Sequence, residues 1–72
     1  MSVSDTNFGA FEPSYTVDEF CMAERISRVA LYDMWKHGRG PAFYYNGVRR
    51  IIPHSARLEY QKRQMAEAER AA

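Results

Sequence analysis

Basic side chains are concentrated in the middle of this 72-residue chain, where they could bind a polyanion. Residues 25–52 hold six Lys and Arg against one acid, a net charge of +5, although the whole chain carries only +1. Residues 1–24, in contrast, hold five acids and no Lys or Arg. A surface that binds nucleic acid needs such a local excess of positive charge. Within this segment Arg28, Tyr32 and Lys36 are spaced four apart, which places them along one side of a helix.

Other reactive side chains do not form a pattern that supports catalysis or metal binding. His37, His54 and the single Cys21 lack the paired close spacing of zinc ligands. Asp33, Glu19 and His37 include no nucleophile beside a base, so we expect no enzyme activity. A chain this short buries only about 60% of its unfolded surface, which leaves little core around a substrate cleft. We therefore expect neither a cofactor nor a metal.

The first helix is predicted over residues 17–24. Thr16-Val17-Asp18-Glu19 fits a capping box, in which the Thr16 hydroxyl and the Glu19 carboxylate each accept a backbone N–H. Acidic side chains in the first turn also suit the helix dipole. Val17, Phe20 and Cys21 would supply the buried face of this helix, and Ile26 would fill the gap before the next one.

The second helix is predicted to begin after Ser27, which is a favourable N-cap residue. Leu31, Met34 and Trp35 share one face and are expected in the core. Gly38 stands where a left-handed C-terminal residue is needed, and Gly40-Pro41 prevents the helix from resuming. Arg28, Tyr32 and Lys36 are thereby left to point away from the core.

A β-hairpin is predicted next, with strands over residues 42–45 and 48–52 around Asn46-Gly47. This dipeptide is the strongest short hairpin signal, because both turn positions of a type I′ turn need positive φ. A two-residue turn there would pair Tyr45 with Val48, Tyr44 with Arg49, and Phe43 with Arg50. Arg49 and Arg50 would then lie on opposite faces of the strand, so that one of them could only cover the core.

The pattern as a whole predicts one small α+β domain with a winged helix-turn-helix architecture. It consists of two short helices, a β-hairpin wing and a C-terminal helix that starts at His54 or Ser55 and ends near residue 69. We expect residues 1–14 to form a disordered arm, residues 15–60 the domain, and residues 61–72 a helical extension that frays or self-associates weakly.

Composition also limits where the protein acts. The lone Cys21 cannot form an intramolecular disulfide, which suits a reducing compartment. The sequence shows neither an apolar run long enough to span a membrane nor a signal-peptide pattern. We expect a cytoplasmic, nucleoid-associated protein that does not bind membranes.

The order of these elements resembles the excisionase and prophage AlpA-type regulator families, small winged relatives of the MerR DNA-binding domain. The resemblance covers about two thirds of the chain, from Tyr15 to Tyr60. It is carried by the order and spacing of YTVDEF at 15–20, IS at 26–27, LYDMWKHGRGPAFYYNG at 31–47, RRIIP at 49–53 and ARLEY at 56–60.

The resemblance implies that the second helix enters the major groove and that the wing lies over the minor groove or the backbone. The chain departs from the family pattern at three positions. Arg25 stands where the turn usually has glycine, Asn46 where the wing often has an apolar residue, and Val48 where it often has a basic one. The wing tip is therefore less charged than in relatives.

Within this architecture, Arg28 is the expected base reader, because a guanidinium binds guanine O6 and N7 bidentately. Lys36 is expected to contact a DNA phosphate. Ser27 is expected to cap the helix and also to donate a hydrogen bond to a phosphate. The complete set of residues predicted to contact DNA is Arg25, Ser27, Arg28, Tyr32, Lys36, Arg39, Tyr44, Arg49 and Arg50.

The expected function is sequence-specific binding of double-stranded DNA, most simply as an excisionase that steers an integrase toward excision of a mobile element. A role in transcriptional regulation is equally compatible with the sequence. A module this small would gain affinity by self-association on repeated sites. The alternative is a protein-interaction adaptor that uses the aromatic hairpin, with Tyr44 and Tyr45, and the helix at 58–72 without binding DNA.

Overall fold

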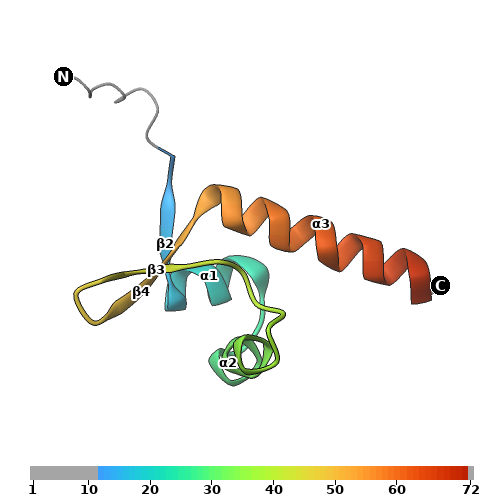
Figure 1. The fold of residues 1–72 in the computed structure, drawn as a ribbon, viewed down its shortest axis with the longest axis horizontal. Helices are drawn as coiled ribbons and strands as arrows, with labels where there is room; N and C mark the ends of the chain where they lie inside the picture. The colour runs from blue at the N-terminus through green and yellow to red at the C-terminus, as the bar shows by residue number, and fades with distance from the viewer. Residues whose placement is uncertain (1–11, 72) are drawn as a thin grey trace.

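The computed structural model describes residues 12–71 and confirms the small α+β fold (Figure 1). Two short helices, a hairpin and a long helix follow one another in the order of a winged helix-turn-helix. The tip of the hairpin and the free end of the last helix point in opposite directions, with α1 between them. The elements are β2 (Ser14–Thr16), α1 (Val17–Glu24), α2 (Arg28–Lys36), β3 (Tyr44–Asn46), β4 (Arg49–Pro53) and α3 (His54–Ala71).

The start of α1 has the predicted capping box. The Glu19 N–H donates to the Thr16 hydroxyl at 3.1 Å, and the Thr16 N–H donates to the Glu19 carboxylate at 3.0 Å. The helix ends at Arg25, whose φ of 60° lies in the left-handed region. This is the position at which the family resemblance leads one to expect glycine, and the backbone explains that preference because glycine adopts positive φ without steric cost.

The two ends of α2 also follow local signals. Ser27 caps the first turn, where its hydroxyl accepts the Ala30 N–H at 3.0 Å. Beyond the last turn, Gly38 adopts a φ of +72° and donates its N–H to the Trp35 carbonyl at 3.0 Å. The chain then passes Trp35 again, because the Trp35 indole donates to the Pro41 carbonyl at 2.7 Å.

The predicted register of the hairpin is wrong by two residues, because the turn begins one residue later than predicted. The observed pairs are Asn46 with Arg49, Tyr45 with Arg50, and Tyr44 with Ile51, so the turn consists of Gly47 and Val48. Gly47 has a φ of +67°, whereas Asn46 and Val48 do not have positive φ. A glycine at the first turn position satisfies a type II′ turn by itself, while the predicted type I′ turn needs a second residue in the left-handed region.

A third strand, β2, was not predicted. Ser14 was assigned to a disordered arm, but Ser14–Thr16 pairs antiparallel with β4, and the sheet has the order β2-β4-β3. The residues before it are also held, because the Pro13 carbonyl accepts the His54 N–H and the Glu12 carboxylate accepts the Ser55 N–H. The rest of the predicted arm lies outside the described residues.

The core lies where α1, α2, β4 and α3 meet. Phe20, Leu31 and Ile52 are completely buried, and each comes from a different element. The Phe20 ring packs edge-on against Tyr60 at a centroid distance of 5.3 Å. The predicted core face of α2 is confirmed, since Met34 and Trp35 pack against this cluster beside Leu31. Ile26 packs there too, between the two helices.

Contacts between α3 and the rest of the domain continue past residue 60, the predicted end of the domain. Glu24 accepts hydrogen bonds from Arg57 at 2.5 Å and from Gln61 at 2.8 Å. Farther along, the Arg63 guanidinium donates to the carbonyls of Arg39 and Gly40, in the segment between α2 and the hairpin. The first turns of the predicted extension therefore help to place the hairpin, and the helix continues to Ala71.

Candidate nucleic-acid interface

A groove of about 530 Å³ opens between the first turn of α1, the first half of α2 and the tip of the hairpin. Three arginines and one carboxylate line it, so its charge is positive. Its lining residues are Thr16, Val17, Asp18, Arg28, Tyr32, Tyr45, Val48, Arg49 and Arg50.

Two smaller hollows share Tyr32 with this groove. One hollow follows the outer face of α2 from Arg28 to Lys36, and the other lies between α2 and Arg50. Five of the predicted site residues are thus brought to one face of the molecule. We call this face the α2–hairpin surface; it contains Arg28, Tyr32, Lys36, Arg49 and Arg50.

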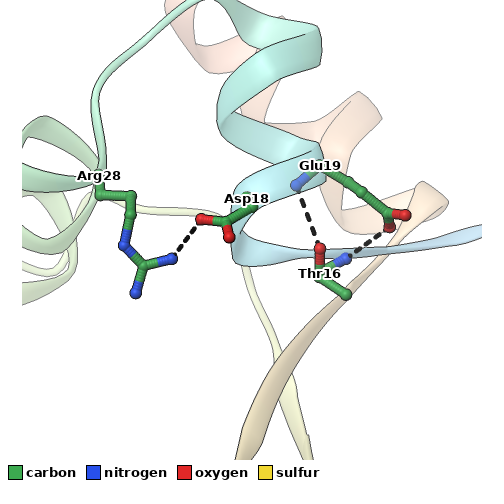
Figure 2. A network of polar contacts seen from close by, with 4 residues as sticks. All are labelled: Thr16, Asp18, Glu19 and Arg28. Atoms are coloured by element: carbon green, nitrogen blue, oxygen red, sulfur yellow. Dashed lines mark hydrogen bonds and ion pairs between the residues drawn. The ribbon is translucent and has the colours of Figure 1, made fainter.

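Arg28 does not extend freely from α2. Its Nη1 lies 2.5 Å from an Asp18 carboxylate oxygen, across the gap between α1 and α2 (Figure 2). The side chains remain 55% and 73% exposed, so both groups stay accessible to a ligand. The hydrogen bond that the Arg28 guanidinium donates to Asp18 raises the pKa of this guanidinium, which remains charged.

Arg50 is held among aromatic rings. Its guanidinium carbon lies 4.7 Å from the ring centroids of both Trp35 and Phe43, and 4.9 Å from that of Tyr32. A fourth ring, Tyr45, lies at 5.9 Å. Each contact is within the range of a cation–π interaction. Because Tyr32 and Trp35 belong to α2 while Tyr45 belongs to β3, Arg50 connects the hairpin to the helix.

This arrangement separates the two wing arginines, as expected from their alternation along the strand. Arg49 is exposed at the edge of the groove, whereas Arg50 is half-buried in its aromatic surroundings. We therefore assign Arg50 a positioning role, in contrast to the direct DNA contact expected from the sequence.

Replacing Arg50 by Ala is expected to destabilise the domain by about 1–2 kcal/mol, since its contacts with several rings are lost. Arg50→Lys should recover part of the loss. Urea denaturation followed by the fluorescence of Trp35, the chain's single tryptophan, measures the effect directly. Arg49→Ala is the matched control, because Arg49 is exposed, and should change stability by less than about 0.5 kcal/mol. Equal effects of Arg49→Ala and Arg50→Ala would contradict the positioning role.

Four other predicted site residues do not line the groove or its hollows. Ser27 is engaged in capping, and Arg25 forms the left-handed turn before it. Arg39 lies in the segment after α2, where its carbonyl accepts a hydrogen bond from Arg63. Tyr44 is 51% exposed and pairs with Ile51, so alternation along the strand places it on the face opposite Tyr45 and Arg50.

Sequence reasoning missed Asp18, Tyr45 and Val48 as parts of this face. Asp18 was interpreted only as a first-turn acid of α1, and nothing in the spacing of ten residues pairs it with Arg28. Tyr45 was given the wrong cross-strand partner. Their positions depend on the packing of α1 against α2 and on the register of the hairpin.

The described residues offer little for metal or thiol chemistry. Residues 12–71 contain no group of three or more His, Cys, Asp and Glu side chains placed to hold a metal ion. Burial raises the pKa of the Cys21 thiol, which keeps it protonated at neutral pH. No helix in this part of the chain is both long enough and apolar enough to cross a membrane.

Comparisons of the chain with protein-family models, with curated proteins and with solved structures found no match. The geometry and charge of the α2–hairpin surface, together with the resemblance described for the sequence, are therefore the features that indicate a function.

Proposed function

We propose that this protein binds double-stranded DNA through the α2–hairpin surface, with α2 in the major groove and the hairpin beside it as a wing. The observation that supports this most strongly is the positive groove between helix and hairpin, lined by Arg28 and Arg49 and continued by Lys36 along α2. The hydrophobic core does not account for this groove, because the core is formed on the opposite side of α2 around Leu31.

The dimensions of α2 suit this role. An α-helix with its side chains is about 10–12 Å across, and the major groove of B-DNA is about 12 Å wide. Arg28, Tyr32 and Lys36 follow one another at successive turns on its outer side. Met34 and Trp35 hold the inner side on the domain, so the outer side can enter the groove without disturbing the core.

Each side chain then has a distinct task. Arg28, at the first turn of α2, reads a guanine edge, and Lys36, at the last turn, neutralises a phosphate. Arg49 contacts the backbone from the wing. Tyr32 has its ring packed at 5.1 Å against Trp35 and is covered by Arg50, so it forms a rigid part of the surface.

We further propose an excisionase role, in which the protein decorates repeated sites and directs an integrase toward excision. The resemblance supports this step, and the same surface would serve a transcriptional regulator. A footprint of the protein on its DNA, followed by an excision assay with a cognate integrase, separates the two. Excision that proceeds equally without the protein would assign it to regulation alone.

The direct test is fluorescence anisotropy with two duplexes of about 20 base pairs. One has random sequence, and the other is enriched from a random pool by repeated selection on the wild-type protein. Binding of both at low salt, with tighter binding of the enriched duplex, is the expected result. No binding at low salt would refute the proposal, and a tight, salt-insensitive complex with a protein would favour the adaptor function instead.

Arg28→Ala and Lys36→Ala should affect these duplexes differently. Loss of the base-reading guanidinium is expected to weaken the enriched duplex about tenfold or more and the random duplex much less. Loss of a phosphate contact should weaken both duplexes by a similar factor. Anisotropy titrations at one fixed salt concentration give, for each variant, the loss of affinity for the enriched duplex relative to that for the random duplex. The reverse pattern would show that the two residues have exchanged roles.

A further inference from the structure

The pairing of Asp18 with Arg28 places a negative charge inside a surface that otherwise attracts DNA. Asp18 belongs to the first turn of α1, and Arg28 to the first turn of α2 (Figure 2). Both side chains line the groove that also contains Arg49. DNA that enters this groove meets the Asp18 carboxylate as well as the arginines.

The ion pair is not explained by stability. Both groups are exposed, and exposed ion pairs contribute little to folding. Asp18 is already favourably placed at the N-terminus of α1, where negative charge suits the helix dipole. Thr16 and Glu19 complete the cap of this helix without it, as Figure 2 shows.

For Arg28 the position is electrostatically unfavourable without a partner. A cation in the first turn of a helix opposes the helix dipole, and the first turn of α2 contains no acid of its own. Asp18 supplies the missing negative charge from the neighbouring helix and holds the guanidinium in one orientation. The Arg28 guanidinium is thereby held in one orientation, and its positive charge is balanced by Asp18 in the free protein.

We propose that Asp18 is a specificity-determining residue of the DNA surface. In the free protein the Asp18 carboxylate is paired with the Arg28 guanidinium. A DNA phosphate therefore gains little binding energy by displacing it, and the negative charge of Asp18 repels the phosphate. A guanine edge offers two neutral acceptors to the same guanidinium and carries no charge for Asp18 to repel. Asp18 therefore weakens non-specific binding more than specific binding. This inference rests on the proposed DNA-binding function.

The test compares Asp18→Asn with Asp33→Asn on the random and enriched duplexes. Asp33 lies on the outer face of α2, in the hollow that also contains Arg28, so both variants remove one negative charge from the same surface. Asp18→Asn is expected to strengthen binding of the random duplex about fivefold to tenfold, the size of one like-charge contact near water. The enriched duplex should gain less than about twofold. Asp33→Asn should strengthen both duplexes by the same small factor.

A double-variant cycle shows whether the effect passes through Arg28. In an Arg28→Ala background, Asp18→Asn should leave the ratio of the affinities for the enriched and random duplexes unchanged, because the guanidinium on which Asp18 acts is absent. Circular dichroism confirms that each variant keeps its helices.

The outcomes are distinguishable. If Asp18→Asn and Asp33→Asn change the ratio of the affinities for the enriched and random duplexes equally, the role of Asp18 is overturned while DNA binding stands. A ratio that still changes in the Arg28→Ala background would overturn the route through Arg28. If the wild-type protein binds neither duplex, the proposed function fails and this inference fails with it.

Discussion

Raising monovalent salt from about 50 to about 200 mM is expected to weaken binding to a random duplex about 150-fold. Each phosphate neutralised by Lys or Arg releases counterions, and the logarithm of the affinity falls with a slope of about −0.9 per phosphate. Four phosphate contacts give a slope near −3.6. Two of the four are proposed for Lys36 and Arg49 of the α2–hairpin surface, and the other two for Arg25 and Arg39, which are exposed outside it. Anisotropy titrations at five or six salt concentrations measure the slope.

The structure lowers this value from the one that charge alone suggests. A segment with a net charge of +5 suggests five neutralised phosphates and a slope of about −4 to −5. Arg50, however, is committed to aromatic rings, and Arg28 is paired with Asp18 and assigned to a base. The contacts of these two arginines remove them from the phosphate count.

Two variants test the assignment. Arg49→Ala should reduce the steepness of the salt dependence by about 0.9, since one phosphate contact is lost. Arg50→Ala should weaken binding through a misplaced wing without changing the slope. If the salt dependence becomes less steep by the same amount in both variants, Arg50 contacts the DNA backbone. An affinity that does not change with salt would argue against DNA binding itself.

Gly40→Ala is expected to destabilise the fold by about 2–4 kcal/mol, combining overpacking with the loss of a partly buried hydrogen bond. A Cβ on residue 40 would lie 2.3 Å from Trp35 Cδ1 and 2.7 Å from Nε1. These atoms belong to a rigid indole that is packed against Phe43 and bonded to the Pro41 carbonyl. The ring cannot move aside without giving up both contacts.

Such a loss is a large fraction of the stability of a domain this small. Urea denaturation followed by Trp35 fluorescence should show a much lower midpoint for Gly40→Ala. Gly38→Ala is the matched control: a Cβ there meets open space, and the cost is limited to its positive φ, about 1 kcal/mol. If Gly38→Ala is the more damaging of the two, the close packing of residue 40 on Trp35 is not what holds the hairpin in place.

Local signals in the sequence were sufficient for most of the helices. The capping box at Thr16 and Glu19 and the N-cap at Ser27 are interactions within four residues, so the side chains that make them can be recognised without the fold. The left-handed residue at Gly38 is a local requirement of the same kind. Leu31 was found because its partners on the helix face recur at helical spacing, which is also a local property.

The hairpin shows where local information ends. Asn46-Gly47 correctly marked a turn, but the register depends on which pairing suits β4, the central strand. That strand must place Ile52 in the core and pair with β2 on its other edge. Strand β2 itself has only three residues, too few for a recognisable alternation, and exists because β4 offers it a partner 35 or more residues away.

Neighbours a few residues apart specify the helices, the basic segment and the side of α2 that faces outward, so these features could be predicted from the sequence. What each arginine contacts depends on the packing of elements that are distant in the sequence. Arg28 and Arg50 have the same side chain, yet one meets a carboxylate and the other a set of aromatic rings. Those partners lie on other elements, and their approach depends on helix angle and strand register, which packing of the whole chain sets.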